Sequence, residues 1–93
     1  MKENRLPTAR AMIPDLVSAL RDLGGTAHVR ELELAVSQRL GLTEMQMNIA
    51  HDKSRSEFQY RLAWSRSYAK KQGLIATTSQ KGYWVIVGSS GDN

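Results

Sequence analysis

The sequence predicts a small α+β domain in which three to four helices precede a β-hairpin. Up to Gly73, apolar residues recur at helical spacing in separate segments, which glycines or capping motifs divide. After Gly73, two runs of β-branched and aromatic residues surround a polar turn. With 93 residues, of which 41% are hydrophobic, the chain has enough apolar content for one compact core and no room for a second.

The first predicted helix covers residues 7–23. Pro7 suits its first turn, where the missing amide hydrogen of proline is no loss. Pro14 either kinks this helix or marks its true start, with the preceding turn held separately. The helix ends before Gly24 and Gly25, and its apolar positions are Met12, Ile13, Leu16, Val17, Leu20 and Leu23.

A brief extended segment and two further helices follow. Residues 26–29 are too few for a helix and are expected to form the edge strand of a small sheet. Residues 29–40 form the second predicted helix, which Gly41 closes. Thr43 and Gln46 make a capping box that starts a short third helix, whose methionines are expected to fill the core.

Residues 54–75 form the stretch around which the chain is organised. Ser54 and Glu57 are spaced as a capping box at its start, and Gly73 can take the left-handed conformation that ends a helix. A narrow buried stripe is predicted at Phe58, Leu62, Ser65 and Ala69. The opposite face carries no acid and consists of Ser56, Gln59, Tyr60, Ala63, Ser67, Lys70 and Lys71.

The last predicted elements are strands over residues 74–78 and 83–87, joined by a turn at residues 79–82. Leu74, Ile75, Trp84 and Ile86 are expected to cover the end of the helical core. Helices followed by a hairpin with a cationic tip are the winged helix-turn-helix plan. We expect this domain to span residues 7–87, between a flexible N-terminus at 1–6 and a disordered tail at 88–93.

Positive charge gathers in the second half of the chain. Residues 1–52 contain six basic and seven acidic residues, a net charge of −1. Residues 53–87 contain seven basic residues against Glu57 alone, a net charge of +6. Such asymmetry is typical of a phosphate-binding surface. The alternative is a solvated surface helix, but such helices usually carry both signs of charge.

The inventory of side chains argues against catalysis. No cysteine is present, no His–acid pair stands near the serines at 54, 56, 65 and 67, and no phosphate-cradling glycine loop occurs. His28 and His51 lack the spacing of a metal site. We therefore expect no catalytic residue, cofactor or metal. No apolar run approaches the roughly 18 residues of a membrane span, and we expect no membrane partner and a cytoplasmic location.

Double-stranded DNA is the expected partner. The N-terminal half of the helix would enter the major groove, with Gln59 able to bind adenine and Arg55 able to bind guanine. Trp64 and Tyr68 could stack on single-stranded bases but are expected to wedge the helix against its neighbours. The DNA-binding set is Arg55, Ser56, Gln59, Tyr60, Arg61, Ala63, Arg66, Ser67, Lys70, Lys71, Gln80 and Lys81.

Two stretches resemble the N-terminal domain of Mrr-type restriction endonucleases. The first runs from Leu6-Pro7 through Leu23-Gly24-Gly25 to Val29-Arg30-Glu31. The second, residues 61–75, has the specific spacing R-x-x-W-x-R-x-Y-x-K-K-x-G-L and is followed by Lys81-Gly82-Tyr83-Trp84. The resemblance implies a winged helix that binds DNA, without the PD-(D/E)xK nuclease domain. Ser65 and Ala69 depart from the family pattern and predict a thinner core under this helix.

Two other readings are left open. A protein-interaction winged helix within a larger restriction or regulatory complex would use the charged face for an acidic partner, although the sequence shows no leftover apolar stripe. A homodimeric regulator of transcription would use the segment with Met45, Met47 and Ile49 as its interface. The sequence does not distinguish restriction from regulation.

Overall fold

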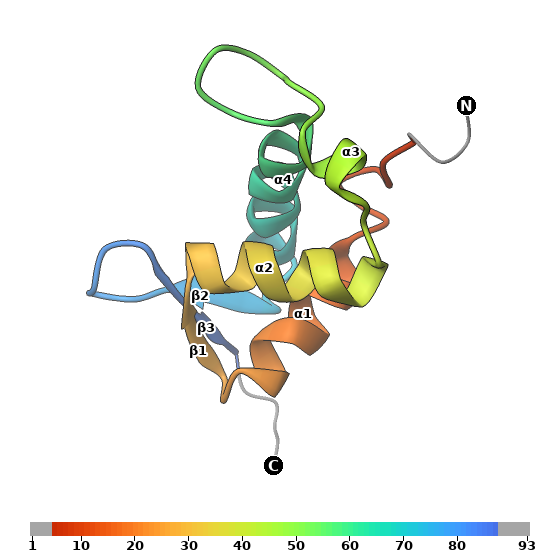
Figure 1. The fold of residues 1–93 in the computed structure, drawn as a ribbon. Coiled ribbons are helices and arrows are strands. Elements are labelled where there is room, and N and C mark those ends of the chain that lie inside the picture. The colour runs from red at the N-terminus through yellow and green to blue at the C-terminus, as the bar shows by residue number, and fades with distance from the viewer. Residues whose placement is uncertain (1–4, 88–93) are drawn as a thin grey trace.

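The computed structural model describes residues 5–87, which form four helices and one three-stranded antiparallel sheet in the order α1 β1 α2 α3 α4 β2 β3. This arrangement is the predicted α+β winged helix-turn-helix fold, in which α2 crosses in front of α4 and the β2–β3 turn projects as a wing (Figure 1). The tail at 88–93 and most of the expected flexible N-terminus lie outside the described residues. None of the described helices combines the length and the apolarity needed to cross a membrane.

Helix α1 covers Ile13–Asp22, so Pro14 marks its start and does not kink it. The preceding turn is separate, as one of the two alternatives predicted, and the Thr8 hydroxyl oxygen accepts a hydrogen bond from the Ala11 amide at 3.1 Å. Leu6 is only 8% exposed and belongs to the core, although the sequence analysis expects it in the flexible N-terminus.

Two capping boxes begin the next two helices. Helix α2 (Val29–Leu40) starts at His28, whose Nδ1 accepts from the Arg30 amide at 3.1 Å while Glu31 accepts from the His28 amide at 2.9 Å. Helix α3 (Glu44–Met47) has the predicted box between Thr43 and Gln46. His28 is therefore a satisfied capping residue.

Helix α4 covers Glu57–Lys71, and its cap differs from the prediction. Ser56, not Ser54, is the N-cap: its hydroxyl oxygen accepts from the Gln59 amide at 3.1 Å, and Gln59 Oε1 accepts from the Ser56 amide at 3.0 Å. Ser54 instead donates its amide to Asp52 Oδ1 at 2.8 Å in the preceding loop. The end is as predicted, because Gly73 has a positive φ of 78° and follows the last turn.

The sheet has the strand order β1-β3-β2, so β1 (Thr26–His28) joins the edge of the hairpin made by β2 (Ile75–Thr77) and β3 (Tyr83–Ile86). The register pairs Ala27 with Trp84 and Ala76 with Val85. Gly82 at the end of the wing has a φ of 83°, and a Cβ there would lie 2.8 Å from His28 Nε2. Glycine is required at this position because the wing turn closes directly against the α2 cap.

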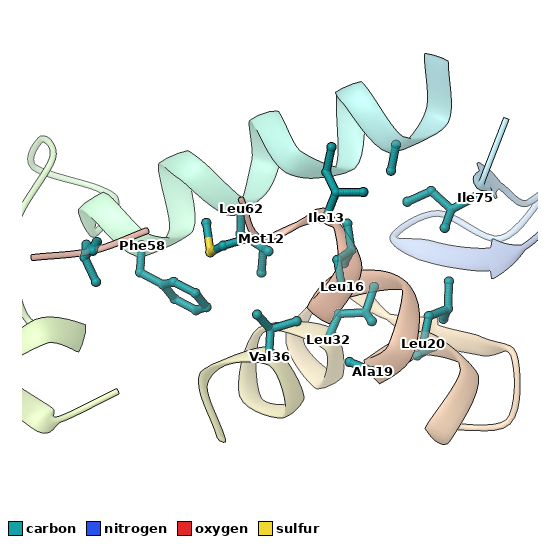
Figure 2. Packing of buried hydrophobic residues seen from close by; sticks show 13 residues of the cluster. Met12, Ile13, Leu16, Ala19, Leu20, Leu32, Val36, Phe58, Leu62 and Ile75 are labelled. Carbon is teal, nitrogen blue, oxygen red and sulfur yellow. The ribbon is translucent and has the colours of Figure 1, made fainter. Parts of the chain in front are cut away.

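The core lies between α4 on one side and α1 and α2 on the other (Figure 2). Phe58, Leu62, Ser65 and Ala69 are the buried residues of α4, which confirms the predicted stripe. Figure 2 shows Phe58 and Leu62 directed toward Leu16, Leu32 and Val36, all of which are fully buried. The Ser65 hydroxyl donates to the Ala9 carbonyl, so this small residue ties α4 to the N-terminal turn. Leu74, expected in the core, is 36% exposed.

Candidate nucleic-acid interface

The outer face of α4 is centred on residues that point away from the buried stripe. Tyr60, Ala63 and Ser67 are half-buried there, while Lys70 and Lys71 are exposed. Trp64 also lies on this face and is 46% exposed. The sequence analysis places Trp64 as a wedge between elements, which is wrong. At about 100° per residue, Trp64 lies about 130° from the middle of the stripe, as far away as Ala63.

Ser56 and Gln59, both predicted to face base edges, form the cap of α4. The Gln59 carbonyl accepts from the Ser56 amide, and Gln59 Nε2 lies 3.4 Å from Glu33 Oε1 on α2. A bidentate contact with adenine needs both the carbonyl and the amino group of the glutamine. Such a contact would therefore break the cap, and the base-reading role of Gln59 stays a prediction.

Arg61 holds one flank of α4 to the N-terminal segment. Its Nε donates to Glu57 Oε2 at 2.7 Å, and its Nη1 donates to the carbonyls of Leu6 at 2.9 Å and Pro7 at 3.2 Å. The hydrogen bond from Arg61, followed by that from His51, lowers the pKa of the Glu57 carboxyl below its ordinary value of 4.5. This guanidinium is thus bound within the domain.

Arg66 occupies the other flank, where it is largely enclosed. Its guanidinium carbon lies 5.7 Å from the centre of the Trp84 ring. Its Nε and Nη1 are buried and have no hydrogen-bond partner among residues 5–87. Burial lowers the pKa of Arg66, and the nearby Glu33 carboxylate partly opposes this effect. Neither of these two nitrogens can reach a phosphate without a change of conformation.

The loop before α4 is built around Asp52. Asp52 Oδ1 accepts from the amides of Ser54 and Arg55, each at 2.8 Å, and these bonds lower the pKa of its carboxyl. The Arg55 guanidinium lies 3.8 Å from Asp52 Oδ2 and 5.4 Å from the centre of the Tyr60 ring. Lys53 is exposed in the same loop. An Asp two residues before a Ser is a sequence signal for such a turn.

The remaining predicted cations lie at the C-terminal end of α4 and on the wing. Lys70, Lys71 and Lys81 are exposed, and none of them makes a salt bridge within the described part of the chain. Gln80, also exposed, is held in the turn because its amide donates to Thr78 Oγ1 at 3.0 Å. The side chains of these four residues are therefore accessible to a partner.

Two hollows adjoin Trp64. The larger, of about 420 Å³, lies between Thr8 and Ala9 of the N-terminal turn and the α4 side chains of Glu57, Tyr60, Arg61, Trp64 and Tyr68. The smaller, of about 260 Å³, is lined by Arg55, Tyr60, Ala63 and Trp64. Trp64 and Tyr60 line both hollows. No group of three or more metal-ligating side chains occurs in residues 5–87.

Comparison with protein families gives one match, in which the model of the Mrr N-terminal domain aligns with residues 10–89. The chain belongs to the Mrr N-terminal domain family. The family predicted from the R-x-x-W-x-R-x-Y-x-K-K-x-G-L spacing is therefore confirmed. Neither the curated proteins nor the solved structures include a match.

The residues of that spacing have different positions in this Mrr N-terminal domain. Arg61 is hydrogen-bonded within the domain and Arg66 is enclosed beside Trp84, whereas Lys70 and Lys71 extend into solvent. Trp64 stands exposed on the outer face, and Tyr68 lies beside it with a ring-centre distance of 5.8 Å. The structure thus separates side chains that are engaged or enclosed within the domain from those that a partner can reach.

Proposed function

We propose that this Mrr N-terminal domain is a non-catalytic module that binds double-stranded DNA, with α4 in the major groove and the wing against the backbone. The observation that carries the proposal is the exposure of Lys70 and Lys71 at the end of α4 and of Lys81 on the wing, without an acidic partner in residues 5–87. Clustered cations of this kind attract phosphates and release counterions on binding.

The shape and composition of the outer face of α4 support the proposal. The major groove admits an α-helix, and the outer face is not covered by another described element over Trp64, Lys70 and Lys71. A winged helix presents such a helix next to its hairpin, as Figure 1 shows for α4 and the β2–β3 turn. Membership of the family also favours a DNA-binding module of a restriction system.

Within the proposal, phosphate contacts and base contacts fall on different residues. Lys53, Arg55, Lys70, Lys71 and Lys81 are the exposed cations that would contact phosphates and fix the register. The side chains left for base edges are those of the outer face, namely Tyr60, Ala63, Trp64 and Ser67. Arg61 and Arg66 would contribute mainly through their long-range charge, since their guanidinium groups are engaged or enclosed.

A protein-interaction module is the second candidate, and exposed apolar side chains favour it. Leu34 on α2 is 60% exposed and Met45 on α3 is 63% exposed. The segment considered for a homodimer exposes less apolar surface, because Met47 and Ile49 are partly buried against the core. A partner bound through Leu34 and Met45 would leave the lysines of α4 and the wing free.

The salt dependence of duplex binding tests the proposal. With four or five phosphate contacts, the logarithm of the binding constant should fall against the logarithm of salt concentration with a slope of about −4. The measurement is fluorescence anisotropy of a labelled random duplex between about 50 and 200 mM salt. Arg21→Ala removes an exposed charge on α1 and serves as the control, which should keep the slope. Binding that does not change with salt would contradict the proposal.

A further inference from the structure

Within residues 5–87, Trp64 is the aromatic side chain of this surface that lacks a partner over its ring. His51 stacks on Tyr60 with a centre distance of 3.6 Å and an angle of 11° between the planes, and the Arg10 guanidinium lies 4.7 Å from the centre of the Tyr68 ring. Among the described residues, Trp64 has no stacked ring and no cation over it, and its contact with Tyr68 is tilted by 32°. An indole left 46% exposed in this way offers a stacking platform.

The larger hollow beside Trp64 has walls suited to a neutral planar group. Its volume of about 420 Å³ lies within the range of about 300–1,000 Å³ found for small-molecule pockets. Glu57 lines it, and this carboxyl stays ionised because Arg61 and His51 hydrogen-bond to it at 2.7 and 2.9 Å. An ionised carboxylate repels phosphate but accepts hydrogen bonds from amino groups, such as those on the edge of a base.

Cations stand next to the hollow rather than inside it. Arg10 lies over Tyr68, and Arg55 lies over Tyr60 at 5.4 Å. Arg61 lines the hollow, but its Nε and Nη1 donate to Glu57 and to two main-chain carbonyls. A DNA strand whose base entered the hollow could therefore place its phosphates toward Arg10 and Arg55. The base itself would contact the Trp64 ring and the Glu57 carboxylate.

We propose that this hollow binds an unpaired nucleobase of a DNA strand, stacked on Trp64 with its amino edge toward Glu57. The inference rests on the proposed function, because it assumes that the domain binds DNA, and it adds a preference for sites where one base is out of the helix. An unpaired base has no pairing partner to give up, so its entry into the hollow costs less than flipping a paired base out of the helix. Cytosine and adenine carry an exocyclic amino group that can donate a hydrogen bond to Glu57, whereas thymine carries none.

The test compares duplexes of one sequence that differ at one position. One is fully paired, and the others carry a single extra cytosine, a single extra thymine or a single extra abasic residue. The cytosine bulge should bind about five- to a hundredfold more tightly than the paired duplex, the range expected for stacking one base on an aromatic side chain. The thymine bulge should gain less, and the abasic bulge should gain little.

Variants identify the platform through the ratio of bulged to paired affinity. Trp64→Ala should bring the ratio for cytosine to about one, and Trp64→Phe should restore part of the preference. Arg21→Ala, on the exposed side of α1 and outside both hollows, should keep the wild-type ratio. A 2-aminopurine at the bulge should lose fluorescence on binding to the wild type, and Trp64→Ala should abolish this loss.

Three results would overturn the inference while leaving the proposed function intact. The first is salt-dependent binding with no preference for any bulge, and the second is equal affinity for the cytosine and abasic bulges. The third is a protein that shows no bulge preference but binds a paired duplex less tightly when its thymines are replaced by uracil. The last would mean that Trp64 contacts methyl groups in the groove. If no duplex binds at all, the proposed function itself is wrong.

Discussion

The two halves of α4 use their polar side chains differently. In the first half, Ser56 and Gln59 form the cap, and Glu57 and Arg61 bind one another and the N-terminal segment. In the second half, Lys70 and Lys71 reach solvent and make no salt bridge within residues 5–87. Both halves look equally polar in the sequence, but the accessible charges are those of Lys70 and Lys71 at the end of the second half.

This contrast shows that the polar residues of a recognition helix can serve the fold as well as a partner. A helix begins with amides that have no partner within the helix, so its first turn needs capping groups. Here the first turn also carries the contact with the N-terminal segment through Arg61 and the contact with α2 through Gln59. Cations at the C-terminal end of the helix are not needed for capping, and they interact favourably with the helix dipole there.

The largest expected effect concerns the second half. Replacing Lys70 and Lys71 together by alanine should weaken duplex binding at least about tenfold at 0.1 M salt and make the salt slope shallower by about 2. Because both side chains are exposed, the unfolding free energy should stay within about 0.5 kcal/mol of the wild type. Anisotropy titrations and thermal melts measure the two effects. An unchanged slope would mean that Lys70 and Lys71 do not contact phosphates.

The cap of the first half should affect stability and not sequence preference. Ser56→Ala should cost about 1 kcal/mol of unfolding free energy, and Gln59→Ala about 0.5–1 kcal/mol, because each removes a reciprocal cap bond. This revises the expectation from the sequence that Gln59 is free on the outer face. If Gln59→Ala instead lost about 1–3 kcal/mol of affinity for one preferred sequence alone, Gln59 would read a base.

Replacing Arg66 should have a smaller effect on the unfolding free energy, and in the stabilising direction. Its Nε and Nη1 are buried without a partner among the described residues, and burying such donors is unfavourable. Arg66→Met keeps the packing against Trp84 but removes the charge, so the unfolding free energy should be unchanged or rise by up to about 1 kcal/mol. Urea titration measures this change. A loss of more than about 1 kcal/mol would mean that the guanidinium has a favourable role in the fold.

The smallest expected effect is the contribution of Glu57 to the pH dependence of the unfolding free energy. The pKa of Glu57 is lowered in the folded state, so its stabilisation is present above about pH 4.5 and is lost as the pH falls through the lowered pKa. On acidification from about pH 6 to pH 3, the wild type should lose about 0.5 kcal/mol more than Glu57→Gln, the size of an i,i+4 pair at a surface. Parallel pH profiles of the two proteins would show that the pair contributes nothing.

Apolar periodicity predicted the elements and the buried stripe because spacing alone determines which residues share a helix face. It could not choose between two overlapping caps, since Ser54 with Glu57 and Ser56 with Gln59 both match the pattern. The choice depends on tertiary structure: Asp52 holds Ser54 in the loop, and a bridge between Ala50 and Ser56 keeps the backbone extended up to the cap.

The candidate site was less predictable than the fold. The positions of Arg61 and Arg66, each about 70° from the middle of the stripe, follow from helix geometry. Their partners do not, because the Leu6 carbonyl and the Trp84 ring come from distant segments. The exposure of Trp64 could have been predicted from the same helix geometry. A residue so far from the buried stripe is buried only if another element covers it.

Amide and arginine Nε chemical-shift mapping with a fully paired duplex tests the central claim most directly. We expect shifts at Lys70, Lys71, the outer face of α4 and the wing turn at residues 78–82, while the Nε signals of Arg61 and Arg66 stay in place. Shifts centred on Leu34 and Met45, with an unmoved wing, would contradict DNA binding by this face. Large shifts of the Arg61 and Arg66 Nε signals would contradict the separation between these two engaged or enclosed arginines and the accessible lysines of α4.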